Sequence, residues 1–237
     1  MRIRRLLPVV TALALAAGAA PAAAADAAIP ADVVTDVLSP EEEAAVHAAA
    51  NAEEKVDIYY QGELIDPAGD WEGAAICAEV NENGTMQCFD SEIEANNRLA
   101  AIAPTAEARE GAAAALAKKT SWKSTVNSSG ALAYDDCPNG WVCLWQDSNF
   151  TGRRLQWPTY ETAKTRHLDQ YSPSFRDKAS SAAVMRSQRG VTLYDFRSGL
   201  PDPRLILTSG WTLWPNFKDY DYTYGGNWND KADAIKF

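Results

Sequence analysis

The C-terminal part of the chain repeats itself with a period of about 50 residues, and this repeat constrains the fold more than any other feature. The stretch FRDKASSAAV begins at Phe175 and WNDKADAIKF begins at Trp228; both read aromatic, polar, Asp, Lys, Ala. The stretches that begin LWQD at Leu144 and LYDF at Leu193 form a second matching pair, offset by 49 residues. Such a period is too long for one coil of a solenoid. It fits two four-stranded Greek-key units that form a two-sheet sandwich with a shared core.

Short extended runs dominate the chain from Cys137 onward. Glycine, proline and aromatic residues separate runs such as WVCLWQD, GRRLQWP, GVTLYDF, RLILTSG and DAIKF, and no helical period lasts beyond a turn or two. This pattern is typical of short β-strands. We therefore expect residues 137–237 to form an all-β domain.

Charge divides the chain at the same place. Residues 26–136 carry six basic and 22 acidic residues, a net charge of −16, whereas residues 137–237 carry a net charge of +3. The basic excess of the second part is small and unclustered, which argues against nucleic-acid binding. The acidic part could dock against the basic part as a pro-region that masks a binding surface, or it could be a solubilising module.

The acidic part predicts a small mixed α+β segment at residues 26–103. Ser39-Pro40-Glu41-Glu42 is typical of a helix start, and we expect that helix to run to about Glu54. An extended stretch with a turn at Gln61-Gly62 follows, then two strands, and then a short helix that begins at Ser91 and runs to about Ala101.

An alanine-rich helix and a polar linker are predicted at residues 104–136. The apolar side chains of Pro104–Lys119 are mostly methyl groups, which bury little area. We therefore interpret this helix as a spacer with high helix propensity between the acidic segment and the β domain.

Residues 1–25 are typical of a secretory signal peptide. Three arginines precede an apolar run that is too short to span a bilayer, and Ala23-Ala24-Ala25 provides a small-residue cleavage site. We expect a secreted, extracellular protein, a monomer that is not bound to a membrane after cleavage.

The four cysteines, an even number in an exported chain, favour disulfides over metal ligation. Three pairings are open, and we favour Cys77–Cys88 and Cys137–Cys143. A four-residue hairpin loop at Asn81–Gly84 would place Cys77 directly opposite Cys88. Zinc ligation by the cysteines is the competing interpretation, but no CxxC occurs and the two histidines are isolated in the sequence.

The stretch CPNGWVCLWQDSNFTGRRLQW, followed by FRDKASS, resembles the secreted bacterial peptidase-inhibitor family with a βγ-crystallin fold. The resemblance covers residues 137–237 and rests on Trp145, Phe150 and Gly152, with Ser180 and Ser181 as further residues of the motif. In such a corner a hairpin folds over, glycine takes a positive φ and the two aromatic rings stack beneath the bend. The second repeat departs from the pattern at its corner, RSGLPDPR.

The resemblance also implies paired calcium sites, with candidate ligands Asp177, Ser180, Asn229, Asp230 and Asp233. Calcium needs six to eight oxygen ligands. Arg176 places a positive charge at the leading ligand position of the first copy, and Ala234 replaces a serine in the second. Ser180 and Ser181 could instead tie the hairpin by hydrogen bonds to the backbone. We expect weak calcium binding at most, and no other cofactor.

No catalytic arrangement is recognisable. The chain contains no G-x-S-x-G, no H-E-x-x-H and no phosphate-binding glycine loop. His47 lies in an alanine-rich helix, and His167 has Asp169 nearby in sequence. We therefore predict no catalytic residues and no enzymatic activity.

The resemblance implies a protease-binding protein whose partner is an extracellular protease, and an inhibitor of metallopeptidases in particular. The stretch 196–204, FRSGLPDPR, offers a loop restrained by proline. Its candidate contact residues are Ser198, Gly199, Leu200, Pro201 and Asp202. The connection 158–174 is a second candidate loop. The alternatives are an envelope or carbohydrate-binding module, favoured by the aromatic stretch YDYTYGGNW, and a purely structural crystallin-like protein.

Overall fold

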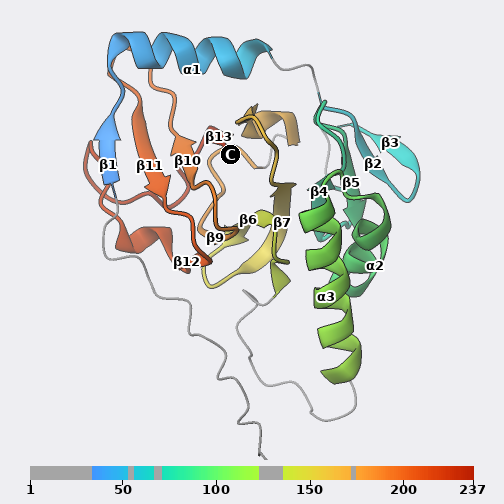
Figure 1. Ribbon diagram of the computed structural model, residues 1–237. Helices are drawn as coiled ribbons and strands as arrows, with labels where there is room; N and C mark the ends of the chain where they lie inside the picture. Colours follow the sequence, from blue (N-terminus) through green and yellow to red (C-terminus); the bar gives the residue numbers. More distant parts are fainter. Residues whose placement is uncertain (1–33, 53–55, 67–70, 123–135, 172–174) are drawn as a thin grey trace, which may run out of the picture.

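The computed structural model describes residues 34–52, 56–66, 71–122, 136–171 and 175–237, which form two β-sheets and three α-helices (Figure 1). The predicted signal peptide lies outside the described residues. The helices are α1 (Pro40–Ala52), α2 (Glu92–Ile102) and α3 (Ala106–Trp122). The strands are β1 (Val34–Val37), β2 (Ile58–Tyr60), β3 (Glu63–Ile65), β4 (Ile76–Glu79), β5 (Met86–Phe89), β6 (Trp141–Asp147), β7 (Thr151–Pro158), β8 (Thr165–His167), β9 (Ser181–Met185), β10 (Val191–Tyr194), β11 (Pro203–Leu207), β12 (Thr212–Trp214) and β13 (Ala234–Lys236).

The C-terminal part consists of strands shared between the two sheets, as expected for a two-sheet arrangement. One sheet has five strands in the order β1-β11-β10-β13-β8, and the other has eight in the order β12-β9-β6-β7-β4-β5-β2-β3. In the first repeat β6, β7 and β9 share a sheet while β8 lies in the other. In the second repeat β10, β11 and β13 share a sheet while β12 lies in the other. Each repeat thus contributes its third strand to the sheet of its partner.

The two Asp-centred stretches occupy matching places in this arrangement. The backbone N–H of Asp177 donates to the carbonyl of Ala232 (3.0 Å), and the N–H of Asp230 donates to the carbonyl of Ala179 (3.1 Å). Asp177 and Asp230 both have positive φ, 55° and 57°. Such left-handed conformations are uncommon outside glycine. The sequence repeat is therefore a repeat of backbone structure, and the two halves exchange equivalent hydrogen bonds.

The acidic segment adds strands to both sheets. β4 runs parallel to β7, with Cys77 opposite Leu155, and β1 runs antiparallel to β11, with Thr35 opposite Leu205. β7 and β11 are the second strands of the two repeats. The segment therefore covers equivalent strand edges, which would otherwise offer unpaired backbone groups to other chains. Whether residue 136/137 divides two folding units stays a prediction, but the sheet hydrogen bonds cross that position.

The predicted helix start at Ser39 is confirmed. The Ser39 N–H donates to Glu42 Oε2 (2.8 Å) and the Glu42 N–H donates to Ser39 Oγ (3.3 Å), which is a capping box. The helix α2 begins after Ser91, as expected, and Ser91 caps it through the N–H of Glu94 (3.3 Å). α1 lies across one end of the five-stranded sheet (Figure 1).

The interpretation of the alanine-rich helix as a spacer is wrong. α3 packs along α2, and its residues Ala108 and Ala112 are fully buried. Gly111 lies so close to Asn139 that an added Cβ would come within 2.7 Å of the Asn139 carbonyl carbon. The indole of Trp141 donates to the carbonyl of Ala108 (3.0 Å). The small side chains of α3 let this helix approach the start of β6 closely. The small area that their methyl groups bury does not reveal this contact.

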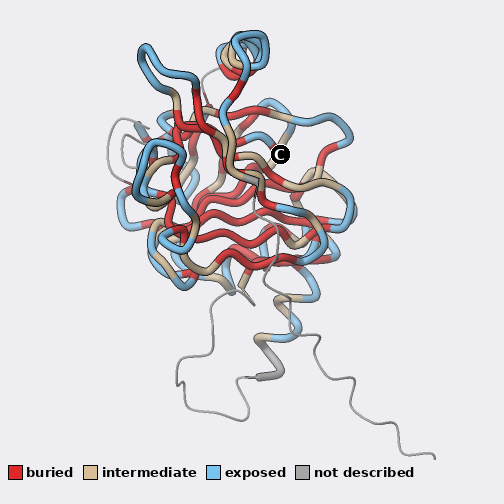
Figure 2. Tube along the Cα trace, turned by 90° about the vertical axis from the view of Figure 1, so that its left-hand side faces the viewer, coloured by how far each residue is buried: buried red, intermediate tan, exposed pale blue. Residues whose placement is uncertain are grey.

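The core lies between and along the sheets, where Figure 2 shows buried strands enclosed by exposed loops. Trp71, from the acidic segment, belongs to the same core cluster as Trp157, Trp214 and Trp228 of the β domain. Both parts therefore contribute to this core cluster. Among the described helices, none combines the length and the apolar character that a membrane crossing requires.

Two C-terminal connections contain different local structure from that expected from the sequence. The stretch YDYTYGGNW forms an isolated bridge between Asp221 and Asn227 instead of a strand, and Tyr222 and Trp228 are buried. It therefore forms no strand with an aromatic face, and Tyr224, at 39%, is its one exposed aromatic side chain among the described residues. The connection 158–174 contains β8 and a 3-10 helix (Leu168–Tyr171), and its residues 161–163 are exposed, so its role as a second candidate loop stays a prediction.

Candidate functional site

The connection between β10 and β11, here named the contact loop (residues 195–203), is held at both ends. The N–H of Asp195 donates to the carbonyl of Pro203 (3.1 Å), and the N–H of Arg197 donates to Asp202 Oδ1 (2.5 Å). The hydroxyl of Tyr224 donates to the carbonyl of Pro201 (2.7 Å). The loop is therefore fixed by hydrogen bonds on either side of its tip.

The tip projects into solvent but Asp202 does not. Ser198, Gly199, Leu200 and Pro201 are exposed, and Leu200 retains 46% of its accessible surface. The side chain of Asp202 is fully buried, with Oδ2 2.7 Å from His47 Nε2 on α1. As a direct contact residue Asp202 is thus a poor candidate; it supports the loop from beneath.

A second set of polar contacts fixes the N-terminal end of the loop. The hydroxyl of Tyr222 donates to Asp195 Oδ2, and the guanidinium of Arg197 lies 3.6 Å from the same carboxylate oxygen. Burial, reinforced by the bond to Asp195, raises the pKa of Tyr222 above its usual range. The phenol therefore stays a hydrogen-bond donor at physiological pH, which keeps the loop base in one conformation.

The candidate calcium ligands lie in two groups, one around Asp230 and one around Asp233. Ser180 Oγ donates to Asp230 Oδ1 (3.2 Å), and Asn229 Nδ2 donates to Asp230 Oδ2 (2.5 Å). These three line a polar pocket, whose other lining residues are Gln146, Asp147, Ser148, Lys178 and Lys218. The two lysines bring positive charge to this group of oxygens, which opposes cation binding.

The second group is occupied by a guanidinium. Arg176 Nε lies 2.5 Å from Asp233 Oδ1, and its NH2 group donates to Asp233 Oδ2 (2.8 Å). The N–H of Phe196 also donates to Asp233 (2.7 Å), while Asp177 lies 3.9 Å from Arg176. Burial raises the pKa of Asp233 to about 6, against the opposing effect of Arg176. Arg176, which stands at the leading ligand position of the first copy, therefore forms an internal ion pair with Asp233.

The first-repeat corner has the positive-φ glycine that the resemblance implied, but its two aromatic rings meet edge to face instead of stacking. Gly152 has a positive φ of 77°, and the Trp145 and Phe150 rings meet edge to face with centroids 5.3 Å apart. Ser181 Oγ donates to the carbonyl of Asp147 (2.7 Å) and accepts from the N–H of Phe150 (3.1 Å). Ser181 thus ties the folded hairpin to the backbone.

Both disulfides have the predicted local pairing. Cys77–Cys88 joins directly opposed residues of β4 and β5, and Cys137–Cys143 closes the turn before β6. The N–H of Val80 donates to the carbonyl of Thr85 (2.9 Å), which closes the expected four-residue loop.

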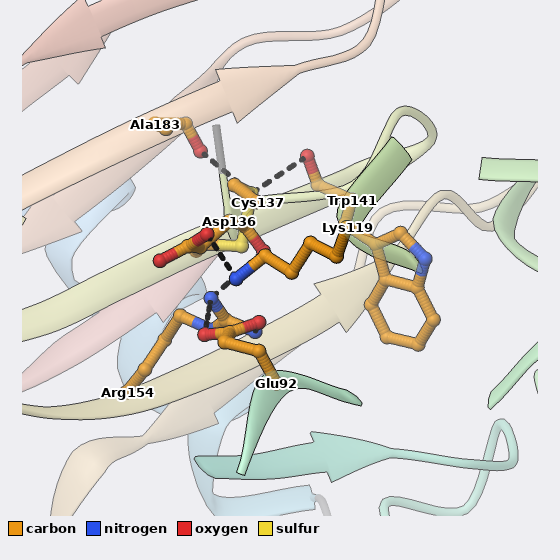
Figure 3. Close-up of polar contacts among 8 residues, drawn as sticks. Glu92, Lys119, Asp136, Cys137, Trp141, Arg154 and Ala183 are labelled. Carbon is orange, nitrogen blue, oxygen red and sulfur yellow. Dashed lines mark hydrogen bonds and ion pairs between the residues drawn. A yellow bond between two sulfur atoms is a disulfide. The ribbon is translucent and has the colours of Figure 1, made fainter. Parts of the chain in front are cut away.

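Arginines of the β domain meet carboxylates of the acidic segment. Arg154 on β7 faces Glu92 on α2 with both NH groups (2.5 and 2.9 Å), beside the ion pair between Lys119 and Asp136 (Figure 3). Arg154 NH1 also donates to the carbonyl of Asp136 (2.8 Å). These contacts attach α2, α3 and the disulfide turn (residues 137–143) to the eight-stranded sheet.

A fully buried pair joins the same two parts elsewhere. Arg166 on β8 donates from Nε to Glu79 Oε2 (3.1 Å) on β4, and both side chains have no exposed surface. Arg166 also donates to the carbonyl of Glu82 (3.1 Å). The sequence carried no signal for this pair, because the partners are 87 residues apart; only the opposite net charges of the two parts pointed to such contacts.

The two histidines contact residues that are distant in the sequence. His167 Nε2 lies 3.3 Å from Asn51 Oδ1, and burial lowers the pKa of His167. His47, which looked isolated in the sequence, contacts Asp202 and packs against Phe196 with ring centroids 4.2 Å apart and the ring planes tilted by 33°. Neither contact alone constitutes a catalytic centre, which would need a nucleophile or a substrate-binding group in reach.

Comparison with known proteins bears on the β domain. No curated protein and no solved structure matches the chain. A family model matches less than a third of the sequence, from before the disulfide turn to the tip of the contact loop, and this agrees with the departure of the second repeat from the pattern. Over residues 130–198 the chain matches the model of peptidase inhibitor family I36.

Proposed function

We propose that this protein is an extracellular inhibitor of proteases. The family match at residues 130–198 suggests protease inhibition and a role that is not enzymatic. Two disulfides are consistent with an oxidising, extracellular compartment. The observation that carries the proposal is the contact loop, an exposed tip on a base fixed by hydrogen bonds.

The physical basis of inhibition is preorganisation. A loop that already has its bound conformation loses little entropy on docking, so more of its contact energy appears as affinity. Pro201 and Pro203 restrict the backbone on either side of Asp202. The bonds of Asp202 to Arg197 N–H and of Tyr224 to Pro201 hold the tip against the domain.

The exposed side chain best placed to enter a protease pocket is Leu200. Interface energy is concentrated in a few anchors that fill pockets on the partner. We therefore expect Leu200→Ala to weaken inhibition at least about tenfold with no change in thermal stability. Leu64→Ala is the matched control, because Leu64 is also an exposed leucine, at 61%, but lies on β3 of the acidic segment.

The experiment is a panel of secreted metallo- and serine proteases assayed with the full chain. We propose metallopeptidases as the target class, so inhibition should appear in the metallopeptidase arm. Inhibition of serine proteases alone would contradict the target class and retain the inhibitor. No inhibition of any protease at micromolar protein would contradict the proposed function. Equal effects of the two leucine variants would contradict the role of the contact loop.

We also propose that the two repeats are Greek-key units of a βγ-crystallin-like sandwich. The exchange of β8 and β12 between sheets and the reciprocal bonds of Asp177 and Asp230 support this description. An experimental structure with a different strand order would contradict it.

A further inference from the structure

Three side chains with metal-ligating atoms meet where α1 covers the contact loop. Glu43 and His47 come from α1, and Asp202 comes from the loop more than 150 residues later in the chain. One ligand atom of each lies within 4.8 Å of the others, and His47 Nε2 lies 2.7 Å from Asp202 Oδ2. One small ion could therefore contact all three groups after minor side-chain adjustment.

The elements on both sides hold these groups in place. Glu43 and His47 are four residues apart, so they lie on one face of α1. The other oxygen of Asp202 accepts the N–H of Arg197 (2.5 Å), which leaves Oδ2 directed at His47. Such an outer hydrogen bond orients a carboxylate ligand in metal sites. The His47 ring is further positioned by Phe196, against which it packs at a tilt.

The charge of the cluster is not balanced by a permanent cation. Asp202 is fully buried, and the one ionisable partner within ion-pair distance among the described residues is His47. Arg204 is engaged with Asp36 and Glu42, and Arg197 directs its guanidinium to Asp195. The Glu43 carboxylate has no side-chain partner in the part of the chain that the structure describes. Buried carboxylates normally have a compensating charge or a metal.

We propose that Glu43, His47 and Asp202 bind a divalent transition-metal ion, with zinc as the best fit. Zinc takes histidine nitrogen and carboxylate oxygen in four-coordinate sites, and three protein ligands leave one position for water. A histidine ligand distinguishes this site from calcium and magnesium sites, which are built from oxygen. It is separate from the pocket at Ser180 and Asp230 that the sequence suggested for calcium.

Bound zinc ties α1 to the base of the contact loop. The ion replaces the His47–Asp202 hydrogen bond with a stronger link between the acidic segment and the β domain. Metal that binds the folded chain alone stabilises it in proportion to the logarithm of its concentration. The site stands on these three residues and does not require that the loop bind a protease.

The test is calorimetric titration of zinc chloride into the tag-free full chain after chelator treatment. We expect one site per chain, a raised Tm, and reversal of both by chelator. His47→Gln and Glu43→Gln should each weaken zinc binding at least about tenfold. Glu41→Gln removes the same charge from the exposed first turn of α1 and should leave affinity unchanged.

Cobalt provides an independent readout, because tetrahedral Co²⁺ absorbs visible light when it occupies a zinc site. The spectrum should appear with the native chain and with Glu41→Gln, and should be lost with His47→Gln. Circular dichroism of each variant establishes that it is folded. Absence of zinc heat with the native chain, or equal affinity in His47→Gln and Glu41→Gln, would overturn the proposal.

Discussion

The replacement of Gly111 by alanine tests how α3 is attached, because the two interpretations of this helix predict opposite signs. In a solvated spacer, Gly→Ala stabilises the helix by about 1 kcal/mol. In the structure the added methyl meets the peptide of Asn139, whose carbonyl carbon would lie 2.7 Å away. Overpacking of this kind costs about 1–3 kcal/mol. Because the neighbour is backbone and cannot rotate away, we expect a net loss of about 2 kcal/mol.

The assay is urea denaturation followed by tryptophan fluorescence. Trp141, which donates to the Ala108 carbonyl of α3, is one of the eight tryptophans that contribute to this signal. A loss of about 2 kcal/mol corresponds to a fall in Tm of roughly 4–8 °C for a chain of this size. Ala113→Gly, at an exposed position of the same helix, should cost only about 1 kcal/mol. A Gly111→Ala protein as stable as the native chain, or more stable, would refute the docked geometry.

Three further predictions concern buried charges and the polar pocket lined by Ser180, Asn229 and Asp230. Arg166→Met should lower the free energy of unfolding, measured by urea denaturation, by about 3–5 kcal/mol, because Glu79 stays buried without the guanidinium of Arg166. The double variant with Glu79→Leu should recover much of this loss. A double variant as unstable as the single one would contradict the argument. The pKa of Asp233 is raised from 3.8 to about 6, so the folded chain holds this proton more tightly than the unfolded chain and loses stability as pH rises between these values. In Tm measurements across pH 4–6, the Tm of Asp233→Asn should therefore change less with pH than the Tm of the native chain. An equal dependence of Tm on pH in the two proteins would contradict this. Calcium titration should give at most weak heat, and Lys178→Gln should strengthen any binding, because this lysine lines the pocket with Asp230; micromolar affinity in the native chain would show that the pocket charge was misjudged.

The elements that short-range signals encode were predictable from the sequence. The capping box at Ser39, the hairpin that opposes Cys77 and Cys88, and the left-handed glycine at residue 152 each depend on residues within about a dozen positions. The repeat added long-range information, because a second copy of the pattern indicates where strands of equivalent position lie.

The contacts between the two parts were not predictable in the same way. A parallel pairing such as β4 with β7 leaves no turn signal, since the strands are far apart in the chain. Gly111 and Gly140 carry no local signal for a contact, although their missing side chains set the approach of α3 to the disulfide turn, residues 137–143. The Glu43–His47–Asp202 cluster depends on the docking of α1 over a loop, which no local pattern specifies.

The position of the acidic segment bears on the idea that it is a removable pro-region. Three arginines of the β domain, Arg154, Arg166 and Arg204, form ion pairs with carboxylates of this segment, and the first two are almost fully buried. Its departure would leave these charges unpaired and would open the edges of β7 and β11. A solubilising module would need none of these contacts. A released β domain would therefore need a partner that supplies both carboxylates and a strand edge, so masking and folding cannot be separated by truncation unless the stability of the truncated chain is measured first.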